Sequence, residues 1–586
     1  MTRTDWRMTF GANLIGADRT RFRIWAPAQR EISVAVEGAP AAPMARREGG
    51  WFEAEVNCGA GARYRYILQD GTAIPDPAAR AQVGDIHGAS VVIDPSSYQW
   101  RHPDWRGRPW HDAVIYELHA GLLGGFAGVA KELPRLAELG ITAVELMPIA
   151  EFPGARNWGY DGALPFAPEC SYGSPDDLRA LVDQAHGHGL MIFLDVVYNH
   201  FGPDGNYLAL YAPQMFRDDV ATPWGPAIDF RRSEVRRFFT DNALYWLIEY
   251  QFDGLRFDAV HAITESDWLD EMASEVRKTV TPRRYVHLVL ENDDNAASHL
   301  NRGFDAQWND DGHHVLHLLL TGEHEGYYED YKDDPAAKLA RCLKEGFIYQ
   351  GEPSPHRGGK LRGTRSVDLP PTAFVLFLQN HDQIGNRAFG ERLTKLANAE
   401  ALEAATSLLL LCPQIPLLFM GEETASQSPF LFFTDHNAEL AKAVREGRQR
   451  EFSGFSQFSD PKLLGQLPDP NDVGTFEKSN PVENGDRLLE RERLYRELLA
   501  LRRTEIVPRL AGARALDAAP IGPAAVVAQW RMADGRVLTI ATNLASRPVQ
   551  LRTPEGRLLF SSSPVARQAL AKGELAAYST IAVLGS

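Results

Sequence analysis

Eight short apolar segments between residues 113 and 423 constrain the fold more than any other feature of this sequence. They lie at 113–119, 143–149, 191–197, 252–260, 285–292, 305–310, 374–382 and 416–423. Amphipathic stretches typical of helices separate them, such as 174–189, which begins with Ser174 as a helix N-cap. Alternation of strand and helix predicts an α/β fold with a parallel sheet. Eight repeats favour a closed (β/α)8 TIM barrel, and a doubly wound open sheet is the alternative, because periodicity alone does not establish closure.

The two ends of the chain have the pattern of small β domains. Residues 1–95 contain short runs rich in β-branched and aromatic residues, which Gly and Pro clusters separate. Near the other end, after a helix predicted at 491–505, strand-like runs flank an Asp534-Gly535 turn, which is a strong hairpin signal. We therefore predict an N-terminal β-sandwich over 1–95, a catalytic barrel with long loops over 105–500 and a C-terminal β-sandwich over 505–586. The charged stretch 445–474 is expected to be a long ordered loop.

Charge and composition exclude several classes of partner. The net charge of −16 argues against nucleic acid or an anionic membrane as the main partner. The first residues lack a secretory signal, and no apolar run is long enough to span a bilayer, so a cytoplasmic protein is expected. The four cysteines are widely scattered and form no CxxC pair, which suggests neither a zinc cluster nor a disulfide framework.

Polar side chains follow four of the predicted strands, at the end of the barrel where enzymes of this architecture carry their active sites. The residues are Asp195, Asn199 and His200 after the third strand, Arg256, Asp258 and His261 at the fourth, Glu291 and Asp293 after the fifth, and His381, Asp382 and Gln383 after the seventh. If the barrel closes, these side chains converge on one mouth.

Three of these carboxylates, Asp258, Glu291 and Asp382, directly follow apolar runs, where a charge costs free energy unless partners or function compensate. Cleavage of a glycosidic bond needs a carboxyl pair, one to protonate the leaving oxygen and one to attack the anomeric carbon or activate water. Arg256 lies two residues before Asp258, so both project from one strand face, and we expect Arg256 to lower the pKa of Asp258. Glu291 would need a raised pKa to serve as the acid.

Aromatic residues suited to sugar rings follow the second strand. Trp158 and Tyr160 lie in the stretch 157–162, and aromatic faces pack against the C–H faces of pyranose rings. Each of these features also has an ordinary structural interpretation. Trp158 and Tyr160 could be core residues, Asp195 a loop cap, Asp258 and Arg256 a structural ion pair, and the histidines simple hydrogen-bonding groups.

A metal site is a further possibility that the sequence raises. Asp310, Asp311, His313 and His314 are metal-ligand types, and carboxylates on adjacent strands could hold a metal in a hydrolase of another class. Adjacent residues on a strand point to opposite faces, however, and paired histidine spacing is missing. No metal and no cofactor is therefore expected.

Four motifs, at 195–200 (DVVYNH), 254–261 (GLRFDAVH), 290–293 (LEND) and 379–382 (QNHD), resemble in order the four signature regions of the α-amylase superfamily of retaining glycoside hydrolases and transglycosylases. The resemblance implies Asp258 as nucleophile, Glu291 as general acid/base and Asp382 as transition-state stabiliser. It also implies that Arg256, His200 and His381 bind the sugar being cleaved, that Asp195 and Asn199 organise the site, and that Tyr160 stacks beneath the ring.

Segments 320–331, 380–393 and 421–455 resemble one branch of that superfamily, which hydrolyses the α-1,4 bond between a terminal trehalose and a maltooligosaccharide. The similarity extends over about 8–585, although the loop after His119 is shorter than is usual there. It implies maltooligosyltrehalose as substrate and the synthase that produces it as metabolic partner. A glucan branching enzyme, a non-catalytic glucan-binding scaffold and a metal-dependent hydrolase are the alternatives. Loops around 155–160, 322–331 and 424–456 are our candidates for the choice of trehalose.

Overall fold

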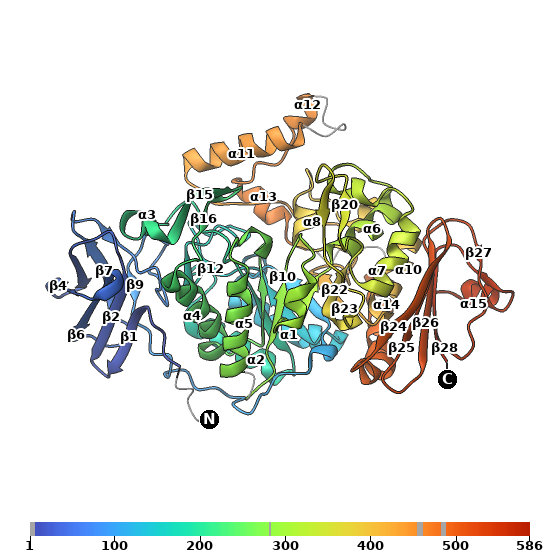
Figure 1. Cartoon of the computed structure of the whole chain (residues 1–586), viewed down its shortest axis with the longest axis horizontal. Helices are drawn as coiled ribbons and strands as arrows, with labels where there is room; N and C mark the ends of the chain where they lie inside the picture. The colour runs from blue at the N-terminus through green and yellow to red at the C-terminus, as the bar shows by residue number, and fades with distance from the viewer. Residues whose placement is uncertain (1–5, 281–282, 454–460, 482–487, 586) are drawn as a thin grey trace.

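The computed structural model describes residues 6–280, 283–453, 461–481 and 488–585, and a closed barrel of parallel strands lies at its centre (Figure 1). The barrel strands, in spatial order, are β10 (Ile115–Leu118), β11 (Ala143–Leu146), β14 (Met191–Val196), β17 (Gly254–Phe257), β18 (His287–Leu290), β19 (Ala306–Trp308), β22 (Phe374–Phe377) and β23 (Ile415–Phe419). Register pairs such as Ile115 with Leu417 join the last strand to the first. Closure confirms the barrel and excludes the open sheet.

Helices separate the strands, as the alternating pattern predicts. Those that follow barrel strands include α1 (Phe126–Leu139), α2 (Pro175–Gly187), α4 (Ser233–Glu249), α5 (Asp267–Thr279), α6 (Asp310–Thr321) and α10 (Ala399–Leu411), and α14 (Leu488–Leu501) leads out of the barrel region. Ser174 caps α2 by accepting from the N–H of Asp177, whose carboxylate accepts from Ser174 in return. The local signal at this helix start is therefore sufficient to place it.

Asp310, Asp311, His313 and His314 lie on helix α6, so the strand argument used against a metal there is wrong. Asn309 caps the helix by accepting from the N–H of Gly312, which turns the chain out of β19. The two histidines have separate partners, because the His313 ring contacts the carbonyl of Leu378 at 2.7 Å and His314 contacts the hydroxyl of Tyr331 at 3.3 Å.

Two sheets form the N-terminal sandwich. One contains β1 (Gly11–Gly16), β2 (Arg19–Trp25), β6 (Trp51–Val56) and β5 (Ala45–Arg46), and the other β4 (Ala42–Pro43), β3 (Ile32–Val36), β7 (Arg63–Leu68), β8 (Ala73–Ile74) and β9 (Ser90–Val91). Phe22 and Tyr64 meet between them with ring centroids 4.8 Å apart. Phe10 packs on Phe238 of α4, which docks the sandwich against the barrel.

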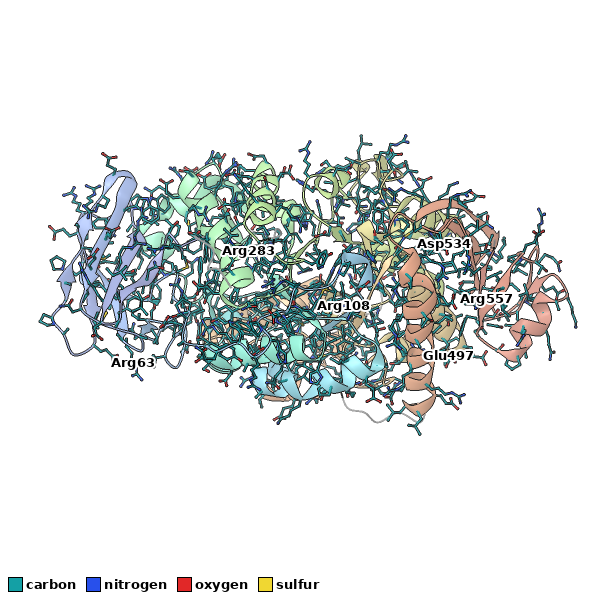
Figure 2. All side chains as sticks on the ribbon, turned by 90° about the horizontal axis from the view of Figure 1, so that it is seen from below. Arg63, Arg108, Arg283, Glu497, Asp534 and Arg557 are labelled. Atoms are coloured by element: carbon teal, nitrogen blue, oxygen red, sulfur yellow. The ribbon has the colours of Figure 1, made fainter. Side chains whose placement is uncertain are left out.

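The C-terminal domain has a main sheet of β24 (Arg514–Gly522), β25 (Ala525–Arg531), β26 (Val537–Asn543), β30 (Ser579–Leu584) and β28 (Arg557–Ser561), with a small sheet of β27 (Val549–Gln550) and β29 (Glu574–Leu575). The predicted hairpin is confirmed, because Arg531 pairs with Val537 around Gly535. Figure 2 shows Arg63 of the first domain and Arg557 of the last at opposite ends of the molecule. The exact domain boundaries stay a prediction.

The stretch 445–474 contains helices, so the prediction of a loop there is wrong. Helix α11 (Ala438–Phe452) covers its first part, and α12 (Pro461–Leu464) and α13 (Val473–Lys478) follow, while residues 454–460 lie outside the described part. Asn437 caps α11 by accepting from two backbone N–H groups. The helix includes Gly447, and one glycine costs a helix only about 1 kcal/mol relative to alanine. None of the helices in the described part of the chain combines the length and apolarity of a membrane crossing.

Candidate active site

A cavity of about 480 Å³ lies at the carboxyl ends of the barrel strands. Most of the residues predicted for the site line it, namely Trp158, Tyr160, His200, Asp258, His261, Glu291, Asp293, His381, Asp382 and Gln383. Asp195, Asn199 and Arg256 do not line the cavity but are buried behind these side chains. The structure therefore brings the predicted residues together, with three of them supporting the wall.

Arg256 is the centre of the site. Its guanidinium donates to Asp195 and, at 2.9 Å each, to Asp258 and Glu291. The guanidinium also lies over the ring of Trp308, 4.2 Å from its centroid, inside the barrel. One buried cation thus holds three carboxyl groups in a fixed arrangement, and two of them face the cavity.

The backbone after β17 connects Asp258 to Glu291, the two carboxyl groups that line the cavity beside Arg256. Ala259 adopts the left-handed conformation, with φ 40° and ψ 46°, which costs a residue with a Cβ about 1–2 kcal/mol. This turn aims the N–H of Ala259 at Glu291, to which it donates at 2.8 Å. A strained residue next to Asp258 therefore serves to position Glu291.

The proton distribution between Asp258 and Glu291 is the reverse of the one predicted. Burial and the neighbouring Glu291 raise the pKa of Asp258 well above its usual range. Burial also acts on Glu291, but Arg256 and the N–H of Ala259 outweigh it and lower the pKa of Glu291. Arg256 was expected to lower the pKa of Asp258. It spans both groups, and the additional backbone donor places the charge on Glu291.

A second chain of contacts runs from β10 to Arg256. Glu117, only 1% exposed, accepts from the backbone N–H of His381 at 3.1 Å and from its ring Nδ1. The other ring nitrogen of His381 contacts the Tyr160 hydroxyl at 2.8 Å, and that hydroxyl donates to Asp195 at 2.7 Å. The sequence reasoning missed Glu117, although a carboxylate inside an apolar strand was a signal that could have found it.

The aromatic residues have different surroundings. Tyr160 stacks on His381, with ring centroids 5.1 Å apart, and also lines the cavity. Trp158 is largely a core residue, because it is 4% exposed, stacks on Phe430 and donates its indole N–H to the carbonyl of Leu431. Trp158 is therefore mainly a core residue, as the alternative interpretation had it, although part of its side chain still lines the cavity.

His200 is fixed from three sides. One ring nitrogen contacts Asn199 at 3.0 Å and the other contacts the carbonyl of Tyr160 at 2.9 Å. Trp224, in the turn between β15 (Phe216–Thr222) and β16 (Gly225–Ile228), stacks on the His200 ring with centroids 5.2 Å apart. Trp224 was not predicted for the site, because its hairpin lies outside the strand pattern, yet this exposed ring lines the cavity.

Asp382 and Gln383 lie on the short helix α8 (His381–Gly385), not on a strand. Asn380 caps it by accepting from the N–H groups of both residues. Asp382 is 40% exposed and accepts from the side-chain amide of Asn386 at 2.8 Å. Asp382 also lines the cavity, so the helix start places its carboxyl group in the same site as Asp258.

The remaining wall comes from the segments after β19 and was not predicted residue by residue. It includes Asp310, His314, Tyr327, Asp330, Tyr331, His356, Arg357, Arg362, Asn386 and Phe432. Arg357 and Arg362 both pair with Asp293, and despite burial they lower its pKa. Asp293 therefore anchors this wall as a charged group. His261 is exposed beside it.

One group of potential metal ligands lies close together among the residues that the structure describes. It consists of Glu151, Glu169 and Cys170, which are outside the cavity. The two carboxylates already accept hydrogen bonds from the backbone: the N–H of Cys170 donates to Glu151 at 2.8 Å, and the N–H of Phe152 donates to Glu169 at 3.1 Å. The arrangement is that of a hydrogen-bonded loop anchor.

Known proteins similar to this chain place it in one family. Residues 86–212 match the alpha amylase catalytic domain, and residues 513–581 match a domain of unknown function, DUF3459. A crystal structure of a candidate alpha amylase from Salmonella typhimurium has a TM-score of 0.92 at 42% identity, covering 99% of this chain and 100% of that one.

Two curated relatives are similar along most of their length. The malto-oligosyltrehalose trehalohydrolase of Deinococcus radiodurans is 43% identical over 86% of this chain and 85% of its own. That of Saccharolobus solfataricus is 41% identical over 80% of this chain and 86% of its own. Since both relatives are more than 40% identical to this chain over at least 80% of its length, the chain belongs to the malto-oligosyltrehalose trehalohydrolase family of glycoside hydrolases.

Proposed function

We propose that this protein hydrolyses the α-1,4 bond between a terminal trehalose unit and a maltooligosaccharide, with retention of configuration. The observation that carries the proposal is the single guanidinium of Arg256, which contacts Asp258 and Glu291 at 2.9 Å each. A carboxyl pair held by one guanidinium, with a third carboxyl group at Asp382 on the same cavity, matches the chemistry of glycosidic bond cleavage. The substrate assignment rests on the names of the relatives.

In the proposed reaction, Glu291 protonates the glycosidic oxygen while Asp258 attacks the anomeric carbon, and trehalose leaves. Glu291 then deprotonates a water molecule, which releases the maltooligosaccharide from Asp258. Asp382 binds hydroxyl groups of the attacked ring most strongly as the ring flattens. Retention predicts that the carboxyl oxygens of Asp258 and Glu291 are about 5–5.5 Å apart.

The other site residues would act on the sugar or on these carboxyl groups. Tyr160 would stack beneath the attacked ring, with His200 and His381 binding its hydroxyl groups. Tyr327 and Phe432 line the cavity from two of the loops we proposed for trehalose selection, 322–331 and 424–456. A maltooligosyltrehalose synthase would supply the substrate.

A branching enzyme would transfer the glucan to another sugar instead of to water, using the same carboxyl groups. Product analysis separates the two activities. Wild type should release free trehalose from maltooligosyltrehalose and little from a plain maltooligosaccharide of equal length, and Asp258→Asn should lose nearly all activity. Branched or elongated products without trehalose would move the protein to the transferases, and undiminished release by the variant would refute the role of Asp258.

A further inference from the structure

Helix α6 contains a buried carboxyl group that the proposed mechanism does not use. Asp311, in the first turn of this helix, is 0% exposed and does not line the cavity, unlike the preceding Asp310. Its two oxygens accept hydrogen bonds from the side chains of Asn295, Tyr331 and Arg362 and from the backbone N–H groups of Ile348 and Tyr349. A carboxylate satisfies so many donors because both of its oxygens only accept. Asp311 is therefore a junction between several segments behind the cavity wall.

Two of these donors hold the segment 291–295, the acid loop, which begins with Glu291. Asn295 ends the loop and donates its side-chain amide to Asp311 at 2.9 Å. Arg362 donates at 2.9 Å to the other oxygen of Asp311, and its Nε donates at 2.8 Å to the carbonyl of Asp293. The acid loop is thus attached to Asp311 at two points, once directly and once through a guanidinium.

The acid loop is a tight turn, so a shift at its end reaches Glu291. Asn295 adopts the left-handed conformation, with φ 48°, which asparagine tolerates better than most residues. Its N–H donates to the carbonyl of Asn292 at 3.0 Å, and Gln307 of β19 donates to the same carbonyl at 2.9 Å. The loop is therefore closed on itself and fixed to the barrel, and Asp311 holds its outer end.

Asp311 also controls the charge beside the acid loop. Burial alone would lower the pKa of Arg362, but Asp311, with Tyr331 and Asp293, raises it well above its usual range. Arg362 is 4% exposed, and its carboxylate partners among the described residues are Asp311 and Asp293. Loss of the charge on Asp311 would leave this buried cation to Asp293 alone, within the acid loop.

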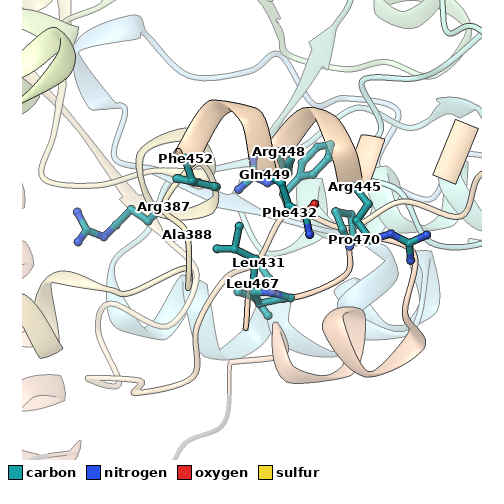
Figure 3. A pocket seen from close by; sticks show the side chains of 11 residues that line it. Arg387, Ala388, Leu431, Phe432, Arg445, Arg448, Gln449, Phe452, Leu467 and Pro470 are labelled. Carbon is teal, nitrogen blue, oxygen red and sulfur yellow. The ribbon is translucent and has the colours of Figure 1, made fainter. Parts of the chain in front are cut away.

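Asp382 is held by a different element. It lies on α8, and the carbonyl of Gly385 at the end of that helix accepts from Arg448 of helix α11 at 3.3 Å. The guanidinium of Arg448 also lies 5.0 Å from the ring centroid of Phe432, which lines the cavity (Figure 3). Asp382 is thus supported from α11 and the acid loop from α6, so the two can be perturbed separately.

We propose that Asp311 is a positioning residue for Glu291, which holds the acid loop through Asn295 and Arg362 and so fixes the direction in which Glu291 delivers its proton. The inference rests on the proposed function for the role of Glu291 as the acid. Asp311 does not line the cavity, so it acts through these partners. A misplacement of about 1 Å can lower the rate of a catalysed step about 10²-fold.

Asp311→Asn isolates this link. The asparagine oxygen can take the place of the carboxylate oxygen that accepts from Asn295, whereas its amide would face the guanidinium of Arg362, donor against donor. On maltooligosyltrehalose, kcat/KM should fall about 10²-fold. Asp253→Asn is the matched control and should leave kcat/KM unchanged. Asp253 is also 0% exposed and hydrogen-bonded, but it precedes β17 and does not line the cavity.

Two aryl glycosides show whether the loss arises at Glu291. Phenyl and 4-nitrophenyl α-maltotriosides place the same ring at the leaving-group position, but phenolate is the more basic leaving group and depends more on protonation. The ratio kcat/KM includes only the steps up to departure of that group, so the later role of Glu291 as a base does not enter. Asp311→Asn should lower kcat/KM about 10²-fold with the phenyl glycoside and less than about fivefold with the 4-nitrophenyl glycoside.

Glu291→Gln is the reference for loss of the acid and should show the same selectivity between the two glycosides. Asn295→Gly breaks the link from the loop side, retains the left-handed conformation and leaves Asp311 its other donors, so it should also lower activity selectively on the phenyl glycoside.

Equal loss on both aryl glycosides in Asp311→Asn would mean that Asp311 acts on the wall as a whole, and it would overturn the inference, as would full activity on the phenyl glycoside. If Glu291→Gln is selective and Asp311→Asn is not, the proposed function stands without this inference. If Glu291→Gln itself is not selective, the assignment of the acid is wrong and the inference falls with it.

Discussion

Replacement of Glu117 by Gln tests the network behind the catalytic carboxyl groups most directly. Burial alone would lower the pKa of His381 from 6.5, but the carboxylate of Glu117 more than compensates and raises this pKa to about 9. His381 is therefore an imidazolium at neutral pH, with both ring N–H groups donating. Glutamine retains the shape and the oxygen acceptor but removes the charge, so the pKa of His381 should fall below 6.5.

The magnitude follows from the shift. A pKa of about 9 in the folded protein, against 6.5 when unfolded, corresponds to about 3 kcal/mol of stability. Because the folded-state pKa is the higher one, this stability is fully present below pH 6.5 and is lost as the pH rises through 9. Both groups are almost completely buried, so solvent screening reduces it little.

Two assays can detect the change in the pKa of His381. Urea denaturation should show that Glu117→Gln costs about 3 kcal/mol more at pH 6 than at pH 10. The alkaline limb of kcat/KM should move from near pH 9 in wild type to below pH 6.5 in the variant, since a neutral His381 binds the sugar less well. An alkaline limb that stays in place in Glu117→Gln would refute the reasoning.

Glu145 provides a matched control on the neighbouring strand. It is paired in register with Glu117 and is equally buried, but neither of its carboxyl oxygens has a hydrogen-bond partner among the described residues. Burial, with the charge of Glu117, raises the pKa of Glu145 well above its usual range, which favours its neutral form. Glu145 makes no hydrogen bond with His381, so Glu145→Gln should leave the pH profile of kcat/KM unchanged.

Three further predictions address the acid, a helix start and metals. Glu291→Gln should lower kcat about 10²–10⁴-fold on maltooligosyltrehalose, and a variant that retains full kcat would exclude Glu291 as the acid. Ser174→Ala should cost about 1 kcal/mol in urea denaturation without changing kcat, because it removes the cap of α2 and Ser174 does not line the cavity; a change in kcat would contradict this. Dialysis against a chelator should leave kcat/KM unchanged, because no step of the proposed mechanism uses a metal, and activity restored only by added Ca²⁺ would show otherwise.

The barrel could be predicted from the sequence because its strands carry a strong local signal. Buried parallel strands read as short apolar runs, and caps such as Ser174 mark the helices between them. The same argument places Asp258, Glu291 and Asp382 at one mouth. Helix α11 was missed because Phe452 is its one buried residue, so it lacks the apolar face on which helix prediction depends.

The far wall of the cavity could not be predicted for a different reason. Tyr327, His356 and Arg362 come from segments with no regular sequence pattern, and their position depends on tertiary contacts such as the pairing of Arg362 with Asp293 and Asp311. Glu117 is an intermediate case. Its burial could be predicted because it lies on a barrel strand. Its partner His381 is 264 residues away, so sequence spacing could not identify the pair.

The charge distribution of the catalytic pair shows where local reasoning fails. Arg256 is two residues from Asp258, which suggested that its charge would act on Asp258, but the guanidinium also reaches Glu291 on the next strand. The N–H of Ala259 then gives Glu291 a second donor. The proposed mechanism requires the proton on Glu291, so binding of the substrate must reverse this order. It follows that the pair titrates as a unit, and that pKa values from kcat/KM and from kcat describe different arrangements of one proton.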